Sequence, residues 1–194
     1  MGVCAVYLDA GYIEKVLMYE HPRARIDYGK LANEMAGKDE LLRAHYYNCL
    51  PYQSNPPTIE EKERYDKKYR FIDALNYVPR FQVRLGQLAL IGIDKDGKKI
   101  FQQKRVDLML GVDMALLAGK GKITHTALFT GDSDTIAAVE AVKQEGVLVT
   151  LWHGSLKGDC SPSRELYKLC DERVELTPQI VARIGLPPAV AKIG

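Results

Sequence analysis

The sequence lacks the cysteine patterns that build zinc sites and disulfide frameworks. Its 194 residues include four cysteines, which lie far apart and form no C-x-x-C pair. This usage argues against both kinds of site and is typical of proteins in a reducing compartment. The chain also has no apolar run long enough to span a membrane, and no basic segment precedes an apolar stretch at its start. We therefore expect a cytoplasmic protein with no signal peptide.

A strong net charge is missing as well. Lysine and arginine total 27, aspartate and glutamate total 25, and the formal net charge is +2. Such a chain cannot bind nucleic acid through its overall charge, so any such site must be a local basic patch. The length predicts one domain with a sizeable core. We expect that domain over residues 1–184 and a tail over residues 185–194, where consecutive prolines prevent a helix from continuing.

Several enzyme motifs are absent. The chain contains neither glycine-rich phosphate loop, G-x-x-x-x-G-K-[ST] or G-x-G-x-x-G, and no G-x-S-x-G nucleophile elbow. These absences argue against nucleotide-binding P-loop proteins, dinucleotide-dependent oxidoreductases and serine hydrolases of the α/β type.

What the chain does contain is a repeated order of short apolar runs and amphipathic segments. Strands are expected at 3–8, 41–50, 80–91 (as one strand or two short ones), 126–129, 147–152 and 174–176. Helices are expected from Tyr12 onward and over 28–35, 59–77, 104–119, 135–144, from Ser161 or Ser163 to 169, and 178–184. A hairpin turn is expected at 94–97, and Thr58 with Glu61 forms a capping box. This order predicts an α/β/α sandwich around a mainly parallel sheet.

Carboxylates follow the expected strands. Asp9 ends the first strand, and Asp132 and Asp134 lie between the strand over 126–129 and the next helix. Asp107 falls in the first turn of another helix. Each could be a helix cap alone. Together at the carboxyl edge of a sheet they would repel one another unless a cation is bound, and oxygen ligands favour Mg²⁺ or Mn²⁺.

Two further polar residues have two readings each. Asp113 lies among apolar residues of the same helix as Asp107, so it must be paired, hydrogen-bonded or bound to metal. It either holds the turn at 130–133 by accepting hydrogen bonds or joins the metal ligands. His153 ends the strand over 147–152, where it either acts on a substrate or is simply a polar strand end.

Basic residues form the expected substrate-binding set together with two neighbours of the carboxylates. Arg84, Lys104 and Arg105 can contact phosphates, and so can the helix over 64–70, where basic and aromatic residues alternate. Such a helix is also explained as a solvated face. Tyr12 and Ser133, which lie beside the acidic residues, complete the set.

Three segments together resemble the NYN domain family, a branch of the PIN-like nucleases. They are VYLDAGYI at 6–13, KRVDLMLGVD at 104–113, and LFTGDSD at 128–134 followed by GVLV. The resemblance covers about residues 3 to 176 and implies a PIN-like α/β/α fold and metal-dependent ribonuclease activity. It marks Asp9, Asp107, Asp132 and Asp134 as the catalytic, metal-binding set, with Asp113 in a position that is commonly acidic. Many members have Asn where this chain has Tyr12.

The predicted function is therefore a metal-dependent endoribonuclease with Mg²⁺ or Mn²⁺ as cofactor and single-stranded RNA as its expected partner. The family is also compatible with a homodimer. A non-catalytic RNA- or protein-binding module on the same fold stays open as the alternative. A phosphatase of the haloacid-dehalogenase type is disfavoured, because Asp9 is not followed two residues later by a second aspartate.

Overall fold

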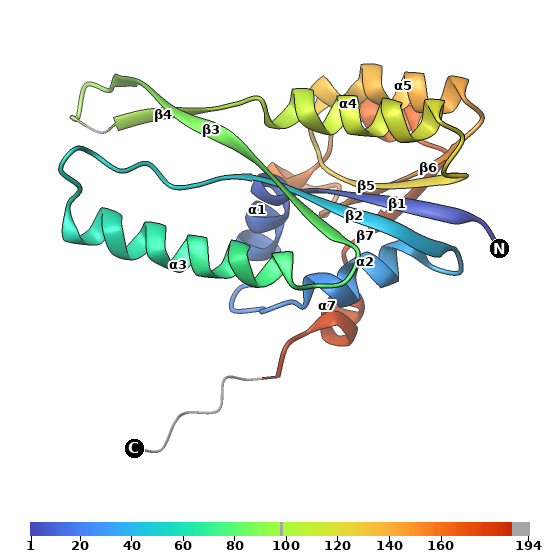
Figure 1. Ribbon diagram of the computed structural model, residues 1–194, viewed down its shortest axis with the longest axis horizontal. Helices are drawn as coiled ribbons and strands as arrows, with labels where there is room; N and C mark the ends of the chain where they lie inside the picture. The colour runs from blue at the N-terminus through green and yellow to red at the C-terminus, as the bar shows by residue number, and fades with distance from the viewer. Residues whose placement is uncertain (98, 188–194) are drawn as a thin grey trace.

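The computed structural model describes residues 1–97 and 99–187, and these form a three-layer α/β/α sandwich (Figure 1). The central sheet has seven strands in the order β4-β3-β2-β1-β5-β6-β7, all parallel to their neighbours except β4. The strands are β1 (Val3–Asp9), β2 (Glu40–Cys49), β3 (Phe81–Ile93), β4 (Lys99–Lys104), β5 (His125–Phe129), β6 (Leu148–His153) and β7 (Glu172–Glu175).

Helices cover both faces of the sheet (Figure 1). They are α1 (Ala10–Glu20), α2 (Tyr28–Ala36), α3 (Ile59–Asn76), α4 (Val106–Gly119), α5 (Ile136–Gln144), α6 (Arg164–Leu169) and α7 (Pro178–Ile184), with short 3₁₀ turns η1 (Ser133–Thr135) and η2 (Gly158–Cys160). Of the helices in the described part of the chain, none is long and apolar enough to cross a membrane.

Strand β1 is buried on both faces and divides the core in two. Val6 and Leu8 point into the cluster beneath α1, α2 and α7, while Tyr7 points into the cluster beneath α4, α5 and α6. Because side chains alternate along a strand, a run that is apolar at every position can serve both layers. This explains why the segment has no polar residue until Asp9.

The strand order places a topological switch point between β1 and β5. From β1 the chain moves outward through β2, β3 and β4, and it then returns through α4 to β5 on the other side of β1. In open α/β sheets, ligands bind beyond the carboxyl ends of the strands at such a point. Asp9 follows one of these strands and residues 130–134 follow the other.

The sequence-based fold class is confirmed, and most expected elements lie within a few residues of their predicted bounds. The capping box of Thr58 and Glu61 is present at the start of α3. Residues 81–93 form one strand, β3, which ends two residues beyond its predicted bound; its first half pairs with β2 and its second half forms an antiparallel hairpin with β4. Of the expected tail, residues 188–194 lie outside the described residues.

Candidate metal centre

The turn between β5 and α5 carries two of the expected carboxylates. Asp132 is the N-cap of η1, and its Oδ1 accepts a hydrogen bond of 3.0 Å from the backbone N–H of Asp134. The main-chain oxygen of Asp132 accepts a second bond, of 2.7 Å, from the hydroxyl of Thr135. The turn is therefore fixed by its own side chains, and both carboxylates remain exposed.

Helix α4 supplies the third carboxylate. Asp107 lies in the first turn of this helix, which starts directly after β4. Arg105 makes the sharp change of direction with a left-handed backbone, φ 75°. That conformation costs an L-residue about 1–3 kcal/mol, so surrounding contacts must hold it. The strained residue lies two positions before the carboxylate that it directs toward β5.

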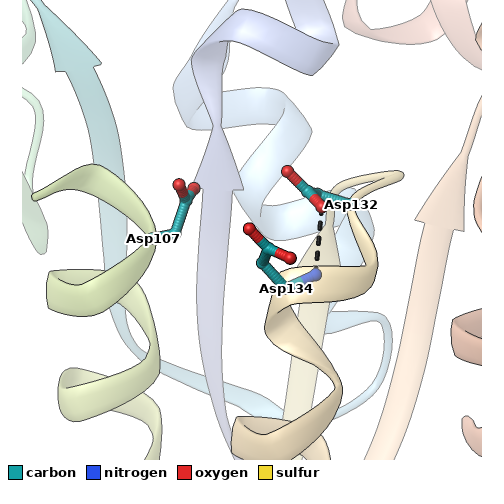
Figure 2. Close-up of side chains that lie close together, drawn as sticks. All are labelled: Asp107, Asp132 and Asp134. Atoms are coloured by element: carbon teal, nitrogen blue, oxygen red, sulfur yellow. Dashed lines mark hydrogen bonds between the residues drawn. The ribbon is translucent and has the colours of Figure 1, made fainter. Parts of the chain in front are cut away.

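These elements bring Asp107, Asp132 and Asp134 into one cluster (Figure 2). One carboxylate oxygen from each lies within 4.8 Å of the others, and no other such group of acidic, histidine or cysteine ligands occurs in the described ranges. Burial and the neighbouring charges of Asp132 and Asp134 raise the pKa of Asp107. Each carboxylate lies at the beginning of a helix or 3₁₀ turn, where backbone N–H groups stabilise negative charge.

Asp9 lies beside this cluster but is not part of the group within 4.8 Å. Its carboxylate accepts hydrogen bonds from the backbone N–H of Tyr12 at 3.3 Å and from the hydroxyl of Thr130 at 2.9 Å. Burial raises the pKa of Asp9 and the charge of Asp107 adds to this effect, whereas the two hydrogen bonds lower it. Asp9 therefore caps α1 and links β1 to the end of β5.

Thr130 is a buried link within the candidate site to which the sequence analysis assigned no role. Its fully buried hydroxyl donates to Asp9 and accepts a bond of 3.3 Å from the backbone N–H of Asp132. It thus joins the ends of β1 and β5 across the switch point. The available signal was its place in the sequence, because a hydroxyl residue at the tip of an apolar strand directly before Gly-Asp can bridge the two carboxylates.

Tyr12 is engaged inside the protein. Its hydroxyl donates to the main-chain oxygen of Cys160 at 2.6 Å and accepts from the N–H of Gly154 at 3.1 Å. Burial raises its pKa to about 12, so the hydroxyl keeps its proton. A Cβ on Gly131 would lie 2.4 Å from the Tyr12 ring, and only glycine allows this approach. Tyr12 thus packs against the turn that presents Asp132, although the sequence placed it among substrate-binding residues.

Asp113 lies outside the cluster that one of its two sequence-based readings would have it join. Arg84 donates to both of its carboxylate oxygens, at 2.9 and 2.6 Å, and the Tyr47 hydroxyl donates at 2.9 Å. Burial favours the neutral acid, but these hydrogen bonds outweigh it and lower the pKa of Asp113. The partners come from β2 and β3 and not from the 130–133 turn. The sequence analysis expected Arg84 to contact phosphate. In the structure its guanidinium binds Asp113, and this ion pair joins α4 to the sheet.

The remaining expected residues fall in two environments. Lys104 and Arg105 are exposed and shortly precede Asp107 in the chain. Ser133 is exposed between Asp132 and Asp134. His153 is buried, with its Nδ1 2.5 Å from the main-chain oxygen of Gly154 and its ring packed edge-on against Tyr167. The structure thus supports the reading of His153 as a polar strand end.

The donor set of the cluster fits a hard divalent cation. It consists of carboxylate oxygens alone, which suit Mg²⁺ and Mn²⁺ better than the softer metals that select thiolate or imidazole. Burial, and then the charges of Asp132 and Asp134, raise the pKa of Asp107, so its charged form is disfavoured in the metal-free cluster. A cation would relieve the repulsion among these charges.

Comparisons with known proteins agree with this fold. No match was found among curated proteins. A solved structure of a Vibrio parahaemolyticus protein of unknown function is similar, with a TM-score of 0.65 and 20% identity over 95% of this chain and 96% of that one. At this identity the similarity establishes the fold alone. The NYN domain family matches residues 4–177, nearly the whole chain. The protein therefore belongs to the NYN domain family.

Proposed function

We propose that this protein is a metal-dependent endoribonuclease that hydrolyses RNA phosphodiester bonds at the Asp107–Asp132–Asp134 cluster. The observation that carries the proposal is the meeting of three carboxylates at the switch point of an NYN-family sheet. These residues would hold Mg²⁺ or Mn²⁺. Such an ion supplies charge stabilisation at a phosphate and lowers the pKa of a bound water.

The protein's own residues then have distinct tasks. Asp107, Asp132 and Asp134 are the proposed metal ligands. Asp9 lies beside them, and the hydrogen bond from Thr130 orients its carboxylate. Lys104 and Arg105 are exposed beside Asp107 and are the proposed contacts to the phosphates of the substrate. Asp113 is not included among the metal ligands, because its oxygens already accept hydrogen bonds from Arg84 and Tyr47. It acts as a positioning residue for α4.

In the hydrolysis, a water oxygen bonds to phosphorus while the bond to the leaving ribose oxygen breaks. The attacking water loses one proton and the leaving oxygen gains one. Lys104 and Arg105 would place the negatively charged backbone at this edge, where an ion held by the carboxylates would offset their repulsion of the phosphates. Binding through phosphate contacts alone gives little base preference and weakens with salt.

The test is cleavage of an end-labelled single-stranded RNA by wild type, Asp132→Asn and Glu140→Gln. Glu140 is an exposed carboxylate further along α5 and is the matched control. We expect cutting with Mn²⁺ or Mg²⁺ in wild type and in the control, and none with EDTA or in Asp132→Asn. RNA binding without metal-dependent cutting in any of these proteins would refute the enzyme and support the non-catalytic module.

A further inference from the structure

A large cleft lies between helix α3 and the β3–β4 hairpin, and none of the three clustered carboxylates lines it. Its volume is about 760 Å³, and its walls come from α1, the end of β2, α3, the hairpin and residues 24–28. Figure 1 shows the hairpin and α3 extending from the sheet on the same side of the molecule. The volume lies within the range of pockets that enclose small organic ligands, about 300–1,000 Å³.

The polar lining of this cleft is basic. Arg64 and Lys67 line it from α3, one turn apart, and Arg25 lines it from the other side. None of these three forms an ion pair within the part of the chain that the structure describes. The acidic residue of the lining, Glu14, is bound by Lys68. Three cations therefore face the cleft with no ion-pair partner among the described residues.

An aromatic platform lies on the hairpin side. Phe101 lines the cleft with 37% of its surface exposed, although it is large and apolar. Its ring lies 5.1 Å from that of Tyr52, and Lys99 sits 4.9 Å from the centroid of Tyr52. Lys99 also forms an ion pair of 3.1 Å with Glu61 at the start of α3. These contacts hold the platform in place and join the hairpin to the helix.

The cleft continues toward the carboxylates. Gln103 lines the cleft and approaches Gly11 at the start of α1. A Cβ atom on Gly11 would lie 3.7 Å from the side-chain nitrogen of Gln103. The same Cβ position is 3.5 Å from a carboxylate oxygen of Asp9. Cys49, also in the lining, is close enough to Asp107 for its charge to raise the thiol pKa, after burial as the main cause. This end of the cleft therefore borders Asp9, which lies beside the proposed centre of hydrolysis.

We propose that this cleft binds the single-stranded segment of an RNA chain next to the bond to be cut, with a base on Phe101 and phosphates on Arg64 and Lys67. The proposal rests on the proposed function for the location of that bond. Cations along one wall and an exposed ring on the other match a phosphate backbone with unstacked bases. Bases in a duplex hide their faces, so the ring selects single strands.

The test measures binding in EDTA, so that it does not depend on cleavage. Fluorescein-labelled single-stranded RNA is titrated against wild type, Arg64→Gln/Lys67→Gln, Phe101→Leu and the control Lys62→Gln, in a series of salt concentrations. Lys62 is exposed on α3 outside the cleft lining. Circular dichroism and melting temperature establish that each variant is folded. Unlabelled uridine monophosphate and a duplex of the same sequence serve as competitors.

We expect Arg64→Gln/Lys67→Gln to weaken binding roughly ten-fold and to flatten the slope of log affinity against log salt by about 1.4, because two phosphate contacts are lost. Phe101→Leu should weaken binding at least about five-fold with the slope unchanged, because base stacking is lost. Lys62→Gln should bind as wild type.

Wild-type affinity in both cleft variants would overturn the proposal, and so would an equal loss in Lys62→Gln. Stronger competition by the duplex, or competition by the mononucleotide as strong as that of the RNA, would also overturn it in favour of another ligand. If the cleft variants lose binding as expected while wild type never cuts RNA, the proposed function fails and the cleft assignment stands.

Discussion

Replacing Tyr12 by Phe separates a structural role of this residue from a role in substrate binding. The substitution removes the hydroxyl that donates to the main-chain oxygen of Cys160 and accepts from the N–H of Gly154. Both backbone groups lose their partner in a half-buried place. Leaving buried polar groups unpaired costs about 1–3 kcal/mol, and we expect Tyr12→Phe to lower the free energy of unfolding by that amount.

For a chain of this length, the expected loss corresponds to a melting temperature lower by roughly 3–10 °C. Urea unfolding followed by circular dichroism measures the free energy, and RNA cleavage at a temperature where both proteins are folded measures activity. The KM for RNA should not change, because the hydroxyl is bonded within the protein. A raised KM with unchanged stability would refute this reasoning and return Tyr12 to the substrate site.

The contact between Tyr12 and Gly131 gives an independent check. A Cβ at residue 131 would lie 2.4 Å from the tyrosine ring, so Gly131→Ala must displace either the ring or the turn. We expect this substitution to be less destabilising in a Tyr12→Ala background, with a coupling energy of about 0.5–3 kcal/mol. Additive effects would show that the two residues do not constrain each other.

Three other substitutions test the electrostatics. Asp107→Asn should stabilise the metal-free protein at pH 7. The raised pKa of Asp107 means that its negative charge disfavours the folded state at pH values above the ordinary pKa of a carboxyl group. Urea unfolding in EDTA measures the change in free energy. Arg84→Met should cost roughly 2 kcal/mol, less than a fully buried pair because Arg84 is 38% exposed, and adding Asp113→Leu should restore stability in urea unfolding. Burial lowers the pKa of His45 from 6.5 to about 4. Between these pH values the unfolded chain binds a proton that the buried ring does not, so the protein has its full stability above pH 6.5 and loses stability as the pH falls toward 4. His45→Phe should remove up to roughly 3 kcal/mol of this pH dependence, and identical slopes for both proteins between pH 7 and 5 would contradict the assignment.

The fold could be predicted from the sequence because its strands are encoded locally. The segment that forms β1 is apolar until Asp9, and only a strand between two helical layers buries all of that run. The carboxylates could be placed at one edge because Asp9 ends one such strand and Asp132 lies three residues after another. The hairpin end of β3 was harder to read, because Gly92 and exposed isoleucines interrupt the alternation that marks a strand.

The partners of Asp113 and Tyr12 could not be predicted, because they are set by tertiary packing. Arg84 and Asp113 are 29 positions apart, and the hydrogen bond from Tyr12 to Cys160 joins residues 148 positions apart. Sequence patterns indicate which residues share a face of one helix or strand. They do not indicate which residues of two distant elements come into contact. The cleft beside α3 has the same origin, since its basic and aromatic walls come from separate elements.

Binding of Mn²⁺, followed by the electron paramagnetic resonance of the free ion, tests the central claim most directly. Wild type, Asp107→Asn and Glu140→Gln are titrated without RNA. The claim predicts a site in wild type and in the Glu140→Gln control that is lost or strongly weakened in Asp107→Asn. Equal Mn²⁺ binding by all three proteins, or none by wild type, would contradict a metal centre at Asp107, Asp132 and Asp134.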